Sequence, residues 1–336
     1  MPERMSWADS HGVTSMARDP GGQCSEPRMA VDETLSGASR AGEIRETSPV
    51  HDAHPPITAV RQAVALALTE DLTPIGDLTS ALLPPELGGT ARFVPRSDGV
   101  LAGRLCAEEA IHQIDSSLDL RWQADDGDRI NAGDEIGRVS GRLAPILTAE
   151  RTALNFLGHL SGIATLTARF VDALADAGGD LRVWDTRKTT PGLRTLEKAA
   201  VRAGGGANHR GNLSDWVLLK DNHLELFGIR AAVERARERW PGRTVHVECG
   251  DLDQVREAVA AGADALLLDN MSPDEVKAVV VEVRGHDPRR PLLEVSGRVS
   301  LDTIWAYATT GADLVSIGAL THSAPALDIG LDVVAD

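Results

Sequence analysis

The stretch VHVECGDLDQVREAVAAGADALLLD, residues 245–269, decides the fold. Short apolar runs at 245–247 and 265–268 are separated by residues 251–261, whose apolar positions recur at helical spacing. Two short strands joined by a helix of this length are typical of a βαβ unit, in which the strands lie parallel. An acid follows each run, Glu248 after the first and Asp269 after the second. The stretch therefore predicts a parallel strand pair with carboxylates at its carboxyl edge.

The same rhythm continues on both sides of this stretch. Four further apolar runs are predicted as strands, at 181–184, 216–219, 292–295 and 314–317, and helical patterns cover 273–283 and 301–309. Strand ends recur roughly every 20–30 residues, which is the spacing of an α/β barrel. Six strands can be counted in this way, so we expect either an incomplete barrel or further strands within 147–177.

The amino-terminal half has a different pattern. Residues 59–68 and 107–114 are predicted as helices and 91–94 as a strand, and turn signals between short apolar runs predict β-hairpins over 120–141. Residues 1–56 contain only five Leu, Ile, Val or Phe residues among many Gly, Ser, Pro and charged residues. Such a composition cannot bury a core, so we expect this segment to be a disordered tail.

Composition excludes several classes of protein. The chain has 336 residues and a net charge of −16, whereas a nucleic-acid binder normally presents a basic surface. No apolar run approaches the roughly 18–20 residues of a membrane span, and the chain does not begin with the apolar core of a signal peptide. Cys24, Cys106 and Cys249 are too scattered for a disulfide framework or a zinc site. We expect a cytoplasmic protein that binds neither nucleic acid nor membrane.

Residues 187–220 reverse this charge. They contain seven basic and two acidic residues, a net charge of +5, and three of the four lysines of the chain. The basic residues are Arg187, Lys188, Arg194, Lys198, Arg202, Arg210 and Lys220. Arginine forks and lysine point charges suit carboxylate and phosphate groups. The alternative is a solvated helix face, since Lys198 and Arg202 are spaced i, i+4.

Polar residues follow every predicted strand. They are 185–188, 220–223, Glu248, Asp269 with Asn270, Ser296 with Gly297, and Gly318 with Ala319. The active site of a barrel lies at the carboxyl ends of its strands, and phosphate is commonly held by the loops after the last strands. We therefore predict a ligand that is anionic at two ends, with a cationic or metal-bound region between them. A phosphorylated sugar fits this description.

Longer motifs surround these strand ends. They are ERTALN (150–155), DTRKTTPGLR (185–194), GGGANHR (204–210), LKDNH (219–223), EVSG (294–297) and GALTHS (318–323). In this order and spacing, the chain resembles the quinolinate phosphoribosyltransferase family over residues 57–332. Several segments of this length are a far more specific signal than the three glycines at 204–206 alone.

The resemblance implies a reaction and a fold. Quinolinate and phosphoribosyl pyrophosphate would give nicotinate mononucleotide, CO2 and pyrophosphate, with Mg2+ as cofactor. The fold would be of the type II phosphoribosyltransferase kind, with an N-terminal α/β sandwich over 57–165 and an incomplete α/β barrel over 166–336. The last residues would pack back on the sandwich. The family works as a dimer in which two chains share each active site, or as a hexamer of six chains.

The resemblance also assigns roles to residues. It implies that Arg187, His209 and Arg210 bind the carboxylates of quinolinate, with Arg151 reaching in from the partner chain. It also implies that Thr186 is a substrate-binding residue. Further roles fall on the other strand ends. The implied catalytic groups are Lys188, Lys220, Glu248 and Asp269, the last two also as metal ligands; the implied phosphate-binding groups are Ser296, Gly297, Arg298, Ile317, Gly318, Ala319 and His322. Arg298 departs from the family pattern, which usually has glycine there.

Some of these residues could instead have purely structural roles. Glu248 and Asp269 could pair with Arg187 or Lys220, His322 could only cap the last loop, and Arg151 could be a surface residue. Two related enzymes are alternatives for the whole chain: a cousin associated with molybdenum transport, and a nicotinate phosphoribosyltransferase. A non-catalytic anion-binding protein would account for the basic stretch, but it would not account for acids at successive strand ends.

Overall fold

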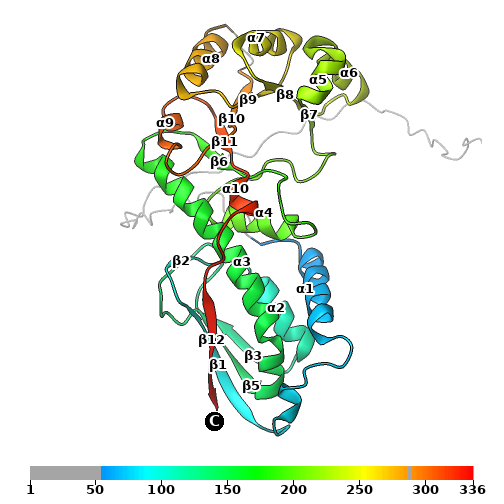
Figure 1. Ribbon diagram of the computed structural model, residues 1–336, viewed down its shortest axis with the longest axis vertical. Coiled ribbons are helices and arrows are strands. Elements are labelled where there is room, and N and C mark those ends of the chain that lie inside the picture. Colours follow the sequence, from blue (N-terminus) through cyan, green and yellow to red (C-terminus); the bar gives the residue numbers. More distant parts are fainter. Residues whose placement is uncertain (1–53, 287–289, 336) are drawn as a thin grey trace, which may run out of the picture. The chain divides into compact units, whose positions relative to one another are not determined.

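A six-stranded parallel sheet forms the carboxyl-terminal half of the chain (Figure 1). The computed structural model describes residues 54–286 and 290–335. The strands lie in the order β6-β11-β10-β9-β8-β7. Their bounds are β6 Arg182–Trp184, β7 Val217–Leu219, β8 Val245–Cys249, β9 Ala265–Asp269, β10 Leu292–Ser296 and β11 Leu314–Ser316. All six predicted strands are confirmed, and since no pairing joins β6 to β7 among the described residues, the barrel is incomplete.

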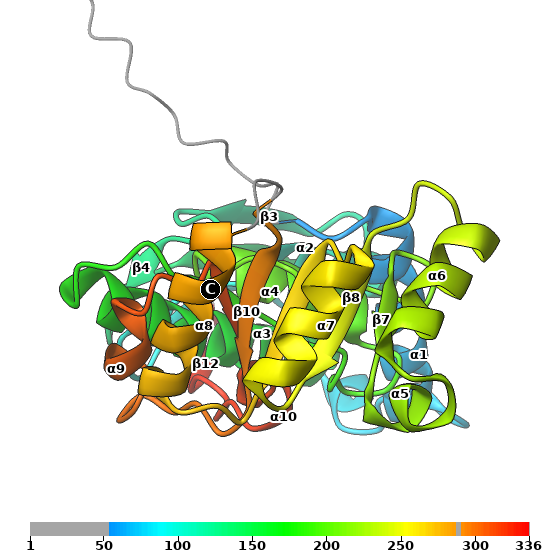
Figure 2. The same ribbon diagram turned by 90° about the horizontal axis from the view of Figure 1, so that it is seen from above.

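Helices between the strands cover one face of this sheet. Figure 2 shows α7 in front of the strands, with α8 and α6 on either side of it. The helices are α4 Arg194–Ala203, α5 Asp221–Phe227, α6 Ile229–Arg239, α7 Leu252–Ala261, α8 Pro273–His286, α9 Trp305–Ala308 and α10 Ala319–His322. The helices predicted at 251–261 and 273–283 are confirmed, whereas the helix predicted at 301–309 is reduced to α9 because residues 301–304 form turns.

The amino-terminal half contains a four-stranded antiparallel sheet in the order β12-β1-β5-β3. Its strands are β1 Gly88–Pro95, β3 Asp119–Trp122, β5 Gly137–Arg142 and β12 Ile329–Ala335. The last strand of the chain thus pairs with the first, antiparallel along its whole length. A separate ribbon pairs β2 Gly99–Val100 with β4 Arg129–Ile130. The hairpins predicted over 120–141 are therefore only partly right, because β4 leaves its neighbours to pair with β2, and β3 pairs with β5.

Three helices pack with this sheet. They are α1 Ile57–Leu72, α2 Arg104–Ile114 and α3 Leu143–Asp176, and a 3-10 helix, η1, covers Ser80–Leu82. The predicted helices at 59–68 and 107–114 are confirmed as α1 and α2. Strands within 147–177 were one of two expectations, and that one is wrong, because α3 is a continuous helix of 34 residues. It contacts α1, α2, α4 and strands of both sheets.

The remaining expectations concern the beginning of the chain and the membrane. Most of the predicted tail, residues 1–53, lies outside the described residues. The first described helix, α1, begins at Ile57. In the part of the chain that the structure describes, no helix is both long and apolar enough to cross a membrane.

Candidate functional site

The carboxyl edge of the parallel sheet brings the predicted acids and one lysine together. Glu248 of β8 pairs in register with Leu267 of β9, and Asp269 lies two residues further along β9. Because side chains alternate along a strand, Glu248 and Asp269 emerge on the same face. Lys220, directly after β7, forms an ion pair with Glu248. The structural pairing considered for Glu248 is therefore present, and it places a cation and two carboxylates side by side at this edge.

The loop after β6 joins the loop after β11. The Thr186 hydroxyl accepts a hydrogen bond from the amide of Lys188 at 3.0 Å, and the Thr321 hydroxyl donates to the Lys188 carbonyl at 2.7 Å. A Cβ added to Gly318 would stand 3.0 Å from the Lys188 side chain and 3.1 Å from Nε2 of His322. Only glycine lets these groups approach so closely. Lys188, Gly318 and His322 thus lie together at the edge.

Two arginines meet beside this loop without forming an ion pair among the described residues. Arg210 is buried, and burial together with the adjacent Arg187 guanidinium lowers its pKa. Nε of Arg187 is also buried, and it has no hydrogen-bond acceptor among the described residues. Neither guanidinium forms an ion pair within the described part of the chain. Two like charges held together in this way favour an anion between them.

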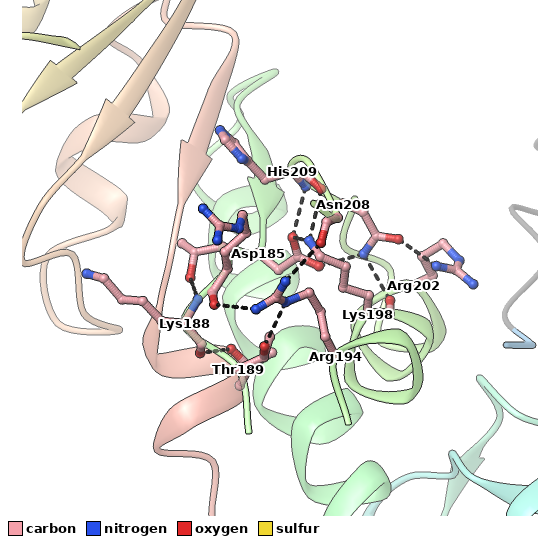
Figure 3. A network of polar contacts seen from close by, with 12 residues as sticks. Asp185, Lys188, Thr189, Arg194, Lys198, Arg202, Asn208 and His209 are labelled. Atoms are coloured by element: carbon pink, nitrogen blue, oxygen red, sulfur yellow. Dashed lines mark hydrogen bonds and ion pairs between the residues drawn. The ribbon is translucent and has the colours of Figure 1, made fainter. Parts of the chain in front are cut away.

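A fully buried carboxylate supports the same region from beneath. Asp185 forms an ion pair with Lys198 of α4, and it accepts hydrogen bonds from Asn208 Nδ2 at 2.6 Å and from the His209 amide at 2.9 Å. Figure 3 shows these side chains converging. Burial raises the pKa of Asp185 and lowers that of Lys198, so each charge depends on the other for its stability. The network fixes the segment at 207–210 to the end of β6.

Arg194 connects the loops that carry the two arginines (Figure 3). Its guanidinium donates to the Thr189 hydroxyl at 3.0 Å, to the Gly211 carbonyl at 3.2 Å and to the Arg187 carbonyl at 3.5 Å. One side chain at the start of α4 therefore holds the loop after β6 next to the residue that follows Arg210.

The loop after β10 and the loop after β11 differ in their backbone groups. Gly297 has a φ of +133°, and a Cβ there would stand 2.6 Å from the Asn270 side chain, so glycine is required. The Ile317 amide donates to the Trp184 carbonyl at 2.9 Å. That amide is therefore engaged in pairing with the end of β6, and the phosphate-binding role of Ile317, Gly318 and Ala319 stays a prediction.

Three predicted residues are exposed to solvent. Arg298 is exposed, and His322 is exposed with Nδ1 2.7 Å from the Ser323 hydroxyl. Arg151 is exposed on α3, eight residues before His159, which pairs with the buried Glu197 of α4 at 2.9 Å. Eight residues of helix span about 12 Å, so Arg151 lies well away from the point where α3 meets α4. The structure of one chain does not bring Arg151 into contact with the other predicted residues.

Comparisons with known proteins decide the family. Residues 77–161 match the N-terminal domain of quinolinate phosphoribosyl transferase, and residues 163–332 match its C-terminal domain. The chain belongs to the quinolinate phosphoribosyltransferase family. It is 41% identical over 282 residues to a carboxylating nicotinate-nucleotide pyrophosphorylase of Mycobacterium leprae, covering 82% of this chain and 97% of the relative.

Two further relatives agree. A probable carboxylating nicotinate-nucleotide pyrophosphorylase of Bacillus subtilis is 41% identical over 261 residues, covering 77% of this chain and 88% of the relative. The solved structure of the nicotinate-nucleotide pyrophosphorylase from Francisella tularensis superposes with a TM-score of 0.79 at 38% identity, covering 84% of this chain and 99% of that structure. The fold expected from the family is confirmed, with an N-terminal sheet region and a C-terminal parallel-sheet α/β region.

The residues that support the site from inside were not predicted from the sequence. Asp185, Asn208 and Glu294 stood within quoted motifs but received no role, and a buried acid in a strand was the available signal for Glu294. His246 gave no signal, because a single histidine within an apolar run is equally typical of a satisfied core residue. Glu294 and His246 are both buried beneath the strand ends that carry the site.

Proposed function

We propose that this chain is a pentosyltransferase that moves the phosphoribosyl group of phosphoribosyl pyrophosphate onto quinolinate, releasing pyrophosphate and CO2 and leaving nicotinate mononucleotide. The observation that carries this proposal is the pair of guanidiniums of Arg187 and Arg210, which forms no ion pair among the described residues. A planar dicarboxylate supplies the missing anions, and arginine forks match carboxylates in bidentate fashion.

The phosphoribosyl end fits the other half of the edge. Lys188 and Lys220 act as point charges on phosphate and pyrophosphate oxygens, and His322 lies beside Gly318 where a terminal phosphate would bind. Displacement at the ribosyl carbon develops positive charge on the sugar, which Glu248 and Asp269 stabilise from the strand ends. Holding acceptor and donor side by side turns a bimolecular step into one within a single complex.

We infer that Mg2+ takes part through Glu248 and Asp269. Mg2+ prefers oxygen ligands and is usually held by one or two carboxylates together with substrate phosphates and water, which fits two acids on one face of adjacent strands. When bound it would neutralise the pyrophosphate as its negative charge develops. The Lys220 ion pair holds the Glu248 side chain at the edge of the sheet.

Decarboxylation needs no dedicated base in this proposal. Ribosylation makes the ring nitrogen quaternary, so the electron pair of the breaking carbon–carboxylate bond flows into the cationic ring as CO2 leaves. The ring carbon then takes up a proton. The arginine pair and His209 only have to hold the ring in place.

We also infer that two chains share each active site. Arg151 is exposed and apart from the other predicted residues in one chain, which suits a role in the pocket of a neighbour. Large apolar side chains are exposed on α1 and on the segment after it, namely Leu66, Ile75, Leu78 and Leu82. Burying such side chains against a second copy would stabilise a dimer. The hexamer and the cytoplasmic location stay predictions.

The test is an assay for nicotinate mononucleotide from quinolinate, phosphoribosyl pyrophosphate and Mg2+, with nicotinate as the control acceptor. We expect turnover of quinolinate and not of nicotinate. Turnover of nicotinate alone would favour a nicotinate phosphoribosyltransferase and contradict the proposal. Inactivity with both acceptors would favour the molybdenum-transport cousin.

A further inference from the structure

A buried polar layer lies directly beneath the carboxyl edge of the parallel sheet. His246 precedes Glu248 by two residues in β8, and Glu294 precedes Ser296 by two residues in β10. Side chains two residues apart share a face, so these residues point the same way as the edge residues above them. Both are buried, with 4% and 1% of their surfaces exposed. Barrel interiors are usually filled by branched apolar residues, so a layer of this kind requires a reason.

The layer is built around one carboxylate. Oε2 of Glu294 lies 3.2 Å from Nε2 of His209 and 3.4 Å from Nε2 of His246. A buried carboxylate is costly to desolvate unless partners surround it. The His209 ring is also enclosed by aromatic side chains, with the centroid of the Trp216 ring at 4.9 Å and that of the Trp184 ring at 6.1 Å. The ring of His209 therefore has little freedom to turn.

The surrounding charge gives the reason for an acid at this place. Asp215 and Glu294 both stabilise the charge of Arg210, whereas the neighbouring Arg187 opposes it. Among the described carboxylates, Glu294 is the one with an oxygen within 3.4 Å of both imidazoles. Glu294 thus supplies buried negative charge beneath the anion-binding pocket before the substrate arrives.

We propose that Glu294 is a positioning residue for the acceptor subsite: by accepting the Nε2 proton of His209 it fixes the tautomer and orientation of that ring, whose neighbour in the chain is Arg210. This inference rests on the proposed function, because the acceptor subsite is that of quinolinate. It assigns Glu294 no contact with substrate and no part in proton transfer.

A metal site is the competing role for the same three residues. The ligand atoms of His209, His246 and Glu294 lie within 4.8 Å of one another, and two histidines with a glutamate form a set that zinc binds. A divalent cation would, however, add two positive charges close to the Arg187 and Arg210 pair, with Glu294 as the one carboxylate of the set. A hydrogen bond between His209 and the carboxylate adds no charge to the layer.

The experiment compares two substitutions of Glu294 with a matched control. Glu294→Gln keeps the size and removes the charge, and Glu294→Asp keeps the charge but shortens the reach. Asp126→Asn is the control, because Asp126 is also a buried carboxylate near a histidine, 3.4 Å from His54, but it lies in the amino-terminal half. KM for quinolinate and for phosphoribosyl pyrophosphate is measured separately, with kcat. The tautomer of His209 is read from its imidazole 15N shifts in the substrate-free protein.

We expect Glu294→Gln to raise KM for quinolinate by at least about tenfold while KM for phosphoribosyl pyrophosphate changes by less than about twofold. The Nε2–H signal of His209 should weaken in Glu294→Gln, Glu294→Asp should fall between this variant and wild type, and Asp126→Asn should change neither KM nor the signal.

Three outcomes would overturn the proposal. They are an unchanged KM for quinolinate, an equal rise in both KM values, and stoichiometric zinc in the purified wild-type protein that Glu294→Gln removes. If Glu294→Gln does not fold, the KM values and the His209 15N shifts of Glu294→Asp test the proposal instead. If wild type does not use quinolinate, the proposed function fails, and the 15N shifts still test the link between Glu294 and His209.

Discussion

Arg187 lies at a position where we expect a substitution to weaken substrate binding without lowering the stability of the fold. Its side chain is half-buried at the end of β6, and its buried Nε has no acceptor in the described part of the chain. We predict that Arg187→Ala raises KM for quinolinate by at least tenfold, because losing one partner of a buried carboxylate–guanidinium pair costs about 2–3 kcal/mol. The melting temperature should change by less than about 2 °C, since no interaction with the core is lost.

Arg182→Ala is the matched control, because Arg182 is an exposed arginine at the opposite end of the same strand. Calorimetric titration with quinolinate measures the affinity, and thermal unfolding measures the stability. Equal quinolinate affinity in Arg187→Ala and wild type would contradict the assignment.

At the residue scale, the sequence predicted the groups that face a ligand better than the groups that support them. Lys188, Lys220, Glu248 and Asp269 follow strand ends, and strand ends can be located from apolar runs alone. The supporting groups could not be found in this way. The pairing of Asp185 with Lys198 depends on how α4 returns to β6, and such long-range geometry has no signature in spacing.

At the scale of elements, α3 shows where pattern recognition failed. Residues 147–177 include Gly158, Ser161 and Gly162, which are typical of turns, so periodicity alone did not identify one long helix. The structure accounts for the small residues. The Leu327 amide donates to the Gly158 carbonyl at 2.9 Å, and the Pro325 carbonyl stands 2.1 Å from where a Cβ on Gly162 would be. The segment leading to β12 crosses α3 at these glycines.

We predict that Gly162→Ala lowers the free energy of unfolding by about 2–3 kcal/mol, because the new methyl group must displace backbone atoms of the crossing segment. Gly250→Ala is the control, since its nearest neighbour would be an ordinary contact at 3.7 Å and its φ is not positive. Urea unfolding of both variants gives the comparison. A Gly162→Ala protein as stable as Gly250→Ala would contradict the prediction, because the crossing segment would then move aside at no cost in free energy.

A second element-scale prediction concerns Asp77, which ties η1 to α3. Its carboxylate accepts hydrogen bonds from the Thr79 and Ser80 amides at 2.9 and 3.0 Å and from the Thr148 hydroxyl at 2.9 Å. Hydrogen bonds from Ser80 above all lower the pKa of Asp77 from 3.8 to about 2. The stabilisation is therefore complete above the unfolded value and is lost as the pH falls from about 4 towards 2.

We expect Asp77→Asn to cost about 1 kcal/mol at neutral pH, because the carboxylate is partly exposed and screened. The difference in unfolding free energy between wild type and Asp77→Asn should shrink as the pH falls towards 2. Denaturant unfolding at several pH values measures it. A difference that is constant with pH would show that the charge of Asp77 contributes nothing.

At the scale of the whole molecule, the order of strands decides which residues meet. β12 closes the amino-terminal sheet against β1, and six parallel strands collect their polar ends on one edge. The sequence predicted the parallel edge because each strand is followed by polar residues. It could not predict that β4 pairs with β2, since β-pairing between distant segments leaves no local pattern. A residue that a second chain contributes to the site likewise cannot be identified from the structure of one chain.

The sharing of sites between two chains gives the last prediction. If Arg151 serves the pocket of its neighbour, every site needs Arg151 from one chain and Lys220 from the other. Homodimers of Arg151→Ala and of Lys220→Ala should then both be nearly inactive. In a heterodimer of the two variants both lesions fall in one pocket and the other is complete, so about half of wild-type activity should return. If Arg151 instead served its own chain, each pocket of the heterodimer would carry one lesion and activity would stay near zero.

Co-expression with two different tags and tandem purification gives the heterodimer, and a doubly tagged Arg151→Ala homodimer prepared in the same way is the control. An inactive heterodimer that is folded and dimeric by size-exclusion chromatography would rule out the shared site, because every other requirement for turnover would be met.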